Sequence, residues 1–416
     1  MVIFDLGGLG VTNVNLHATQ ELLRKIITGK TDDLEFMSGY QIRVFWGLTY
    51  DHTWSSIFVI IITITINILG ATHNLLTVIL HHDQHDVLSL MELCHYATLF
   101  ISLLSMCSVT ISQSKKTKTF CELLEKDFNN PNEELSPRQN SIKQYSNTFI
   151  CTLGKWLIVL FFSGISGSYL RRPILESAPD PEEYTLPYIG WVPFKVDTIP
   201  KCIPVWIFQA AISINVVCGH YCFFMSFAIH ANHLYSHCDM LAVHLEETFD
   251  FDSVKTSNRE YYIKRRLKEA IKKHQILIRY FFRIQDLYSY SLLAMGLFSG
   301  LMFCTCIYMV SDPDSTIYMI ASVSSFMIGE FILIGLYCWF GQRVVDKWEN
   351  IKDTIYNIEW YTQSITTKKT LLLIMTMCTR DKVIKGGGLQ EFSMKGFSEL
   401  LQAGFSSYNM LKAMRN

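Results

Sequence analysis

The sequence carries little charge and lacks most signatures of a soluble enzyme. Only 18% of its 416 residues are charged, the formal net charge is −1, and nothing resembles a nucleic-acid-binding motif. The twelve cysteines form no CxxC…CxxC arrangement. The glycine triplet at 386–388 is not followed by the GK[ST] of a phosphate-binding loop. We therefore expect no cofactor, no metal site and no nucleic-acid partner.

Long apolar runs are what the sequence has instead. Half of the residues are hydrophobic and 13% are aromatic, with a mean hydropathy of +0.21. Because about 20 helical residues cross a hydrocarbon core of about 30 Å, the runs predict an all-α membrane protein with seven transmembrane helices. The N-terminus shows no cleavable leader pattern, so the first run is expected to direct insertion. The seven runs lie at 57–80, 93–111, 149–170, 203–229, 287–310, 317–340 and, more polar than the rest, 389–414.

Basic residues are distributed unevenly among the connections. The N-terminal segment holds four of the 36 Lys and Arg residues. The connections after the second, fourth and sixth runs hold six, ten and nine, where Lys395 is counted with the last of these. The connections after the first, third and fifth runs and the C-terminal end hold none, four, none and two, and Lys155 lies within the third run. Since basic residues stay cytoplasmic, this predicts a cytoplasmic N-terminus and an extracellular C-terminus, the reverse of a G-protein-coupled receptor.

The remaining segments suggest four parts. Residues 1–56 form a cytoplasmic segment with an amphipathic helix around Leu22–Ile27. Residues 57–340 hold the first six helices, and 231–286 form a long inner helical extension. Residues 341–385 form cytoplasmic anchor helices, in which the run at 371–378 is too short to cross and is expected to be buried. Residues 386–416 contain the seventh helix and an extracellular tail. Exposed apolar faces on the inner helices predict an oligomer.

Two further segments have distinctive compositions. The connection between the third and fourth runs is rich in proline, which excludes a regular helix there and favours an ordered outer lid. The last run places Glu399, Gln402, Ser406, Asn409 and Ala413 in a polar or small stripe at helical spacing. Such a stripe suits a helix that lines an aqueous pore. The alternative is a helix whose polar face packs against its own bundle.

The C-terminal third resembles the insect odorant receptors. The resemblance is carried by Tyr356 with Trp360 and Tyr361, by Lys368 and Lys369 before a Leu/Ile/Met run, and by Phe397 before the SSYNMLKAM segment. The LPYIGWVPFKVD stretch at 186–197 is similar to the family's outer-loop pattern. The related gustatory receptors, which end in a TY…QF pattern, are the alternative, and the SSYNMLKAMRN ending favours the odorant branch.

The resemblance implies a subunit of a ligand-gated, non-selective cation channel in the plasma membrane of a sensory-neuron dendrite. The partners that it implies are an odorant co-receptor in a heterotetramer, a small volatile odorant or pheromone, membrane lipid and permeating cations. The second inner loop lacks the co-receptor's long insertion, so we read a ligand-specific tuning subunit. The family's last helix lines the pore, and its narrow gate falls on Met410 and Met414. The stripe positions Gln402, Ser406, Asn409 and Ala413 are then expected to line the pore.

A ligand pocket is expected in the outer half of the bundle, enclosed by the second, third, fourth, fifth and sixth helices. An apolar pocket with few polar groups suits a small volatile molecule. The residues offered there are Tyr96, Phe100, Phe161, Phe162, Ser166, Tyr169, Trp206, Gln209, Tyr308, Tyr318 and Ser324. Glu330 is an intramembrane carboxylate. It could pair with Lys155 or His220, or belong to an internal hydrogen-bond network.

Catalysis is the weakest alternative. The HHDQHD segment at 81–86 offers an HxxxxD pair that could serve as a general base, but no other group joins it and a solvated loop is the better interpretation. A G-protein-coupled receptor would carry a DRY-like and an NPxxY-like motif, and a transporter would show related halves. The sequence has none of these features, so we expect a receptor channel and no enzyme.

Overall fold

The computed structural model describes residues 54–81, 87–113, 115–117, 119–120, 123, 135–175, 184–250, 259–380 and 382–415. Within these ranges, side chains are described except at 54–60, 81, 162, 164–175 and 414–415. The amphipathic helix predicted in the N-terminal segment and the loop at 82–86 lie outside the described residues.

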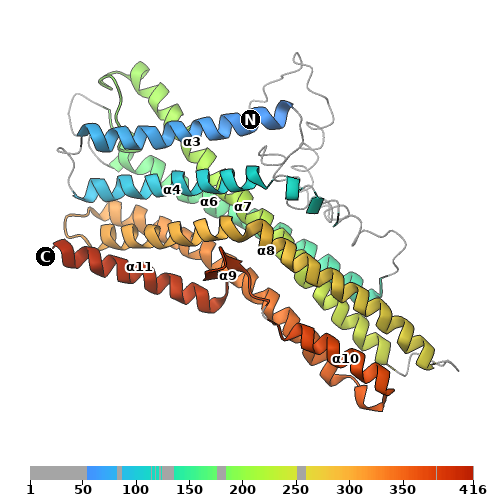
Figure 1. Cartoon of the computed structure of the whole chain (residues 1–416). Helices are drawn as coiled ribbons and strands as arrows, with labels where there is room; N and C mark the ends of the chain where they lie inside the picture. The colour runs from blue at the N-terminus through green and yellow to red at the C-terminus, as the bar shows by residue number, and fades with distance from the viewer. Residues whose placement is uncertain are drawn as a thin grey trace.

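The described chain is almost entirely helical (Figure 1). Its only strands, β1 (Lys385–Gly386) and β2 (Gln390–Glu391), pair antiparallel with Lys385 opposite Glu391. The short 3₁₀ turn η2 spans Trp360–Thr362. The helices are α3 (Trp54–His81), α4 (Val87–Ser112), α6 (Pro137–Leu175), α7 (Ile199–Phe249), α8 (Arg259–Ser311), α9 (Ile317–Asn357), α10 (Ile365–Cys378) and α11 (Met394–Arg415).

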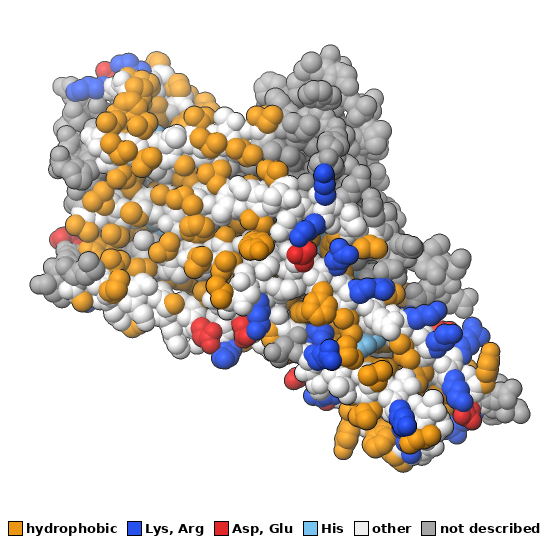
Figure 2. Space-filling model, viewed as in Figure 1, with side chains coloured by type: hydrophobic (Ala, Val, Ile, Leu, Met, Phe, Trp, Pro, Cys, Tyr) orange, Lys and Arg blue, Asp and Glu red, His pale blue; other side chains and the backbone are white. Residues whose placement is uncertain are grey.

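Each of the first six predicted spans falls within one of these helices, whereas the seventh, predicted at 389–414, begins five residues before α11 and includes β2. Among the described residues, five stretches are long and apolar enough to cross a membrane: Ile61–Leu80, Val87–Ser112, Ile199–Phe249, Arg259–Ser311 and Ile317–Asn357. The other two spans belong to α6 and to the more polar α11. Figure 2 shows hydrophobic side chains spread over the face formed by α3, α4 and their neighbours, while Lys and Arg gather on the elongated end. The chain is therefore an all-α membrane protein.

Three helices extend far beyond the thickness of a membrane. α7, α8 and α9 have 51, 53 and 41 residues, so α8 is about 80 Å long at about 1.5 Å per residue. Figure 1 shows that their ends extend beyond α3, α4 and α11 and lie beside α10. We call this part the anchor bundle: residues 137–148, 230–249, 259–286 and 341–357, with η2 and α10. α7 continues past the fourth span to Phe249, α8 begins at Arg259 ahead of the fifth span, and α9 continues past the sixth span to Asn357.

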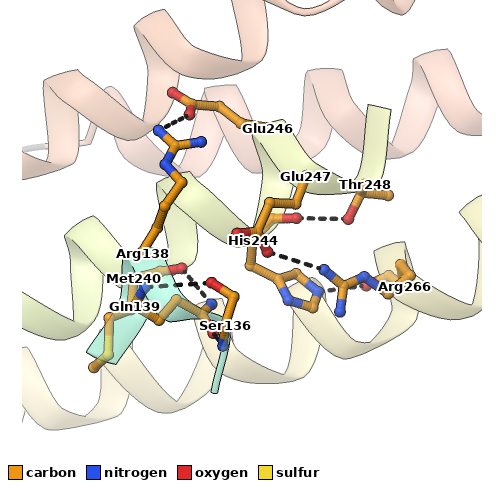
Figure 3. A network of polar contacts seen from close by, with 9 residues as sticks. All are labelled: Ser136, Arg138, Gln139, Met240, His244, Glu246, Glu247, Thr248 and Arg266. Atoms are coloured by element: carbon orange, nitrogen blue, oxygen red, sulfur yellow. Dashed lines mark hydrogen bonds and ion pairs between the residues drawn. The ribbon is translucent and has the colours of Figure 1, made fainter. Parts of the chain in front are cut away.

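The anchor bundle has an apolar core and polar cross-links near its surface. Trp348, Ile351 and Ile355 on α9 are almost completely buried. Figure 3 shows polar contacts that join α6, α7 and α8. These contacts join Arg138 to Glu246 at 2.8 Å, Arg266 to Glu247 at 3.6 Å, the Gln139 amide to the Met240 carbonyl at 3.0 Å, and the His244 ring to the Arg266 carbonyl at 3.2 Å.

α10 buries one of its faces against the anchor bundle. Leu371, Ile374 and Cys378 are buried, and burial raises the pKa of the Cys378 thiol to about 12. Leu372 and Leu373 are each 63% exposed in the single chain, because a helix placed on the outside of a bundle covers only one side of itself. That a neighbouring subunit covers this second face stays a prediction.

The predicted proline-rich lid is shorter than expected. α6 continues through Pro173, and α7 begins at Ile199, so that Pro200 and Pro204 lie inside it. Pro200 costs no helical hydrogen bond, because first-turn amides have no intrahelical partner. Residues 184–198 remain irregular, with the Tyr184 amide donating to the Val196 carbonyl at 2.8 Å. We call residues 184–198 the lid.

The glycine triplet forms the turn of a hairpin that connects the anchor bundle to α11. Gly387 and Gly388 have φ values of +58° and +73°, which favour glycine. Gln285 on α8 brackets Lys385: its side chain accepts from the Lys385 amide at 2.8 Å and donates to the Lys385 carbonyl. The Gly387 amide donates to the Ser289 carbonyl at 2.9 Å. The hairpin therefore fixes the start of α11 against the middle of α8.

Candidate functional site

A narrow cavity lies between α3, α4, α7 and α9 beneath the lid. Its lining is mostly apolar, with a few polar groups at its edge. The cavity volume is about 50 Å³, which is enough for water but below the ~300–1,000 Å³ typical of pockets for drug-sized ligands. The lining residues are Gly70, His73, Asn74, Tyr96, Leu99, Phe100, Tyr188, Gln209, Ile212, Ser213, Val216, Val217 and Phe326.

The lid is held over this cavity by hydrogen bonds from two helices. Gln209 on α7 accepts from the Tyr188 amide at 3.2 Å and donates to the Tyr188 carbonyl at 3.3 Å. The Tyr188 hydroxyl reaches Ser213, one turn further along α7. On α3, Thr77 accepts from the Trp191 amide at 2.7 Å. These bonds satisfy lid backbone groups that would otherwise be buried without partners.

Aromatic rings form one wall of the cavity. The ring centroids of Tyr96 on α4 and Tyr188 in the lid are 4.8 Å apart, within the range of favourable aromatic pairs. The Tyr96 hydroxyl donates to Glu92 at 3.4 Å. Ligand contact at Tyr96 would therefore bear directly on the lid.

An ion pair joins the end of the lid to the first turn of α7. Lys201 donates to Asp197 at 2.7 Å and holds the pKa of that carboxyl below its ordinary value. Both side chains are well exposed, so the pair contributes little to stability.

The predicted ligand residues are only partly brought together. Tyr96, Phe100 and Gln209 line the cavity. Phe161, Tyr318 and Ser324 are not among its lining residues; Phe161 instead contacts the Tyr221 ring at a centroid distance of 6.2 Å.

The other predicted ligand residues either lie away from the cavity or have side chains outside the described residues. Trp206 lines a separate apolar groove with Tyr184, and Tyr308 packs beside Tyr408 of α11. The side chains of Phe162, Ser166 and Tyr169 are outside the described residues.

Several lining residues were missed because the first span was left out of the expected pocket. His73 and Asn74 are polar residues inside an apolar span, a signal that ordinarily marks function. Ser213 lies one helical turn after Gln209 and shares its face. Tyr188 is part of the quoted lid sequence, yet nothing in the sequence places it over α7.

α11 presents two different faces. Leu400, Gly404 and Tyr408 are buried against the rest of the chain, with Phe397, Leu401 and Leu411 half-buried. Every described member of the polar stripe is exposed: Glu399, Gln402, Ser406, Asn409 and Ala413. The alternative in which this stripe packs against its own bundle is therefore wrong.

The buried face of α11 packs closely on α8. A Cβ atom added at Gly404 would lie 3.0 Å from the Phe303 Cβ and 3.4 Å from the Gly300 carbonyl oxygen. Tyr408 and Tyr308 belong to one buried cluster. Of the two predicted gate residues, Met410 is 63% exposed, whereas the side chain of Met414 is outside the described residues.

Glu330 forms a hydrogen bond with a neighbouring helix. Ser299 on α8 donates to it, which matches the network alternative. His220 instead bonds to Ser102 at 2.8 Å and to its own helix, and Lys155 is exposed.

Comparison with known proteins identifies the family. The family model for the 7tm Odorant receptor matches residues 84–405, so the chain belongs to the odorant receptor family. Odorant receptor Or2 of Anopheles gambiae is 28% identical over 155 residues, or 36% of this chain and 39% of that protein. Odorant receptor 88a of Drosophila melanogaster is 22% identical over 231 residues, 54% of this chain and 55% of that protein.

The similarity extends to co-receptors and to a solved structure. The odorant receptor coreceptor of Harpegnathos saltator is 21% identical over 160 residues, covering 38% of this chain and 33% of that protein. The match thus spans about a third to just over half of these curated relatives. The olfactory receptor OR5 of Machilis hrabei in complex with eugenol has the same fold, with a TM-score of 0.73 and 15% identity over 94% of this chain and all of that one.

Proposed function

We propose that the chain is the odorant-binding subunit of a ligand-gated, non-selective cation channel. The observation that carries this proposal is the orientation of α11: its apolar face packs on α8, and its polar stripe is left exposed along the whole helix. Polar side chains at membrane depth need water or a polar partner. Several subunits that turn this face toward a common axis would enclose a hydrated path for cations.

The proposed orientation places the anchor bundle in the cytoplasm. The Lys and Arg side chains that gather on the elongated end in Figure 2 support this orientation through the positive-inside rule. The N-terminus is then cytoplasmic, the lid and C-terminus are extracellular, and the chain is a multi-pass protein of the plasma membrane. By family resemblance, that membrane belongs to the dendrite of a sensory neuron.

The proposed partner is an odorant co-receptor, in a heterotetramer. One subunit offers a single polar stripe, which cannot enclose a pore by itself. Exposed apolar residues on the anchor bundle supply a surface for neighbouring subunits, because monomers rarely leave such patches uncovered outside a membrane. Similarity to co-receptors as well as to odorant receptors is consistent with subunits of one shape.

The proposed ligand is a small, mainly apolar volatile molecule in the cavity beneath the lid. The lining is apolar, with hydroxyl, amide and imidazole groups to orient a ligand. Since the cavity is narrower than an aromatic ligand requires, ligand entry is expected to move Tyr96, Tyr188 or Phe100. Displacing Tyr188 would break its hydrogen bonds with Gln209 on α7. Ligand binding could in this way change how α7 packs against its neighbours.

Co-expression in a cell without native odorant receptors tests the function. With a co-receptor, we expect an odorant panel to evoke a cation current that reverses near zero millivolts and is lost when this chain is omitted. A panel response identical with and without this chain would contradict the proposal.

Truncating Phe100 tests the cavity. Phe100→Ala removes contacts with the ligand and enlarges the space beneath the lid. Because the loss of buried aromatic contacts costs about 1.4 kcal/mol or more, we expect the half-maximal concentration of the best ligand to rise at least tenfold. Bulkier ligands should become more potent, since the enlarged space admits them. Tyr318→Ala removes an exposed aromatic on α9 outside the cavity and is the matched control. Equal dose–response shifts in the two variants would contradict this placement.

A further inference from the structure

Arg343 on α9 has no hydrogen-bond acceptor or carboxylate partner among the described residues. Its guanidinium carbon lies 4.9 Å from the Tyr235 ring centroid and 4.9 Å from that of Trp339. Its Nε is enclosed and makes no hydrogen bond within the described part of the chain, and no ion pair of Arg343 occurs among those residues. The neighbouring carboxylate of Asp239 is already paired with Lys347 at 2.7 Å. The two rings hold the guanidinium in place while its charge stays uncompensated.

The depth of Arg343 corresponds to a membrane surface. It comes three residues after the apolar stretch of α9 ends and lies at the start of the α9 part of the anchor bundle. Trp339, one turn earlier, has its ring centroid 5.8 Å from that of Phe149 on α6. Tryptophan and tyrosine concentrate at the level of lipid headgroups, where an arginine meets phosphate. Arg343 therefore lies where the chain leaves the membrane.

An exposed apolar face of α6 rises from the same point. Tyr145, Trp156 and Val159 are 73%, 70% and 61% exposed, and with Phe149 and Thr152 they recur at spacings of four, three, four and three along one side of the helix. From Phe149 to Val159 this face is about 15 Å long at about 1.5 Å per residue, which is half of a ~30 Å hydrocarbon core. This described stretch is therefore long enough to accompany an acyl chain through one leaflet.

We propose that the inner end of α6 and α9 is a binding site for one anionic phospholipid of the leaflet that borders the anchor bundle. The lipid phosphate accepts hydrogen bonds from the Arg343 guanidinium between Tyr235 and Trp339. One acyl chain lies along the α6 face at Trp156 and Val159. A planar guanidinium suits the two oxygens of a phosphate. The headgroup is anionic because a zwitterionic lipid supplies its own cation and gains less from the uncompensated charge of Arg343.

This inference depends on the chain crossing a membrane, not on its proposed gating by odorants. The two can therefore fail separately: a lipid that is retained by a complex without odorant response would leave the site intact. Equally, an odorant-gated channel that retains no anionic lipid would leave the proposed function intact.

Lipid retention by the full-length receptor complex tests the site. The complex is purified in detergent, incubated with phosphatidylserine or phosphatidylcholine, washed, and analysed by native mass spectrometry for lipid bound per chain of this receptor. We expect retained phosphatidylserine to exceed phosphatidylcholine at least tenfold. Arg343→Gln should abolish that excess, Arg343→Lys should lower it, and Lys352→Gln, nine residues further along the same helix, should leave it unchanged. Size-exclusion profiles and melting temperatures identify any variant that fails to fold.

Two further experiments distinguish a bound lipid from free phosphate. Trp156→Ser removes part of the proposed acyl-chain surface while keeping Arg343, and we expect it to lower phosphatidylserine retention. Competition with millimolar inorganic phosphate should not remove the lipid; displacement would overturn the lipid assignment in favour of a free-phosphate site. Equal retention of phosphatidylserine by wild type and Arg343→Lys, or equal retention of both lipids by wild type, would also overturn it, whether or not Arg343→Gln folds.

Discussion

Replacing Leu372 and Leu373 together with aspartate is expected to abolish assembly with the co-receptor. Both side chains are 63% exposed on α10, outside the apolar spans, where no lipid covers them. Exposed Tyr356, Tyr361 and Ile365 extend the same end of the anchor bundle. If a neighbouring subunit covers this surface, each introduced carboxylate would be buried without a partner, at a cost of about 2–5 kcal/mol. The summed cost of two buried carboxylates is comparable with the whole binding free energy of a subunit interface of ordinary affinity.

Co-purification of the tagged co-receptor measures this outcome. We expect a loss of more than tenfold in recovered partner and no odorant-evoked current, while the variant itself remains folded because neither leucine is in the core. Tyr261→Asp, which introduces the same charge at an exposed aromatic near the start of α8, should preserve assembly. Undiminished recovery of the partner by the double variant would show that this surface faces solvent.

A leucine at Gly404 is expected to remove the odorant-evoked current. The Cβ alone would lie 3.0 Å from the Phe303 Cβ, so the longer side chain forces α11 away from α8. Overpacking of this kind costs about 1–3 kcal/mol, comparable with the free energy that separates the states of a ligand-switched protein. We therefore expect the current to vanish, or to become independent of odorant, at unchanged surface abundance.

The matched change is on the facing helix. Gly300→Leu inserts the same side chain where a Cβ would meet nothing within 4 Å, and we expect gated current to persist. Surface biotinylation with whole-cell recording distinguishes lost gating from lost protein. A normal odorant response from Gly404→Leu would mean that the position of α11 against α8 does not govern the pore.

The helices and their faces were largely predictable from periodicity. Apolar length identified each span, and apolar residues at helical spacing, such as Trp348 and Ile351, correctly continued α9 past the membrane. Proline-based reasoning failed at Pro173, where the helix persists. A lone proline costs a helix one hydrogen bond, and neighbouring helices can compensate for that loss.

The cavity was less predictable than the helices. Tyr96, Phe100 and Gln209 followed from knowing which half of each span faces the lid. His73 and Tyr188 did not, because their meeting depends on how the lid folds back across α3 and α7, a tertiary contact with no local sequence signal. Similarly, composition revealed the polar stripe of α11, but only the packing of Gly404 on α8 showed that the stripe turns away from its own bundle.

Chemical accessibility along α11 tests most directly whether its exposed face lines the conduction path. Cysteine is placed singly at Gln402, Ser406 and Asn409 on the exposed face and at Leu400 and Tyr408 on the buried face, and a cationic thiol reagent is applied during odorant-evoked current. We expect rapid, irreversible block at the three exposed positions and none at the two buried positions or in wild type. Block at the buried positions, or unchanged current at all three exposed ones, would contradict it.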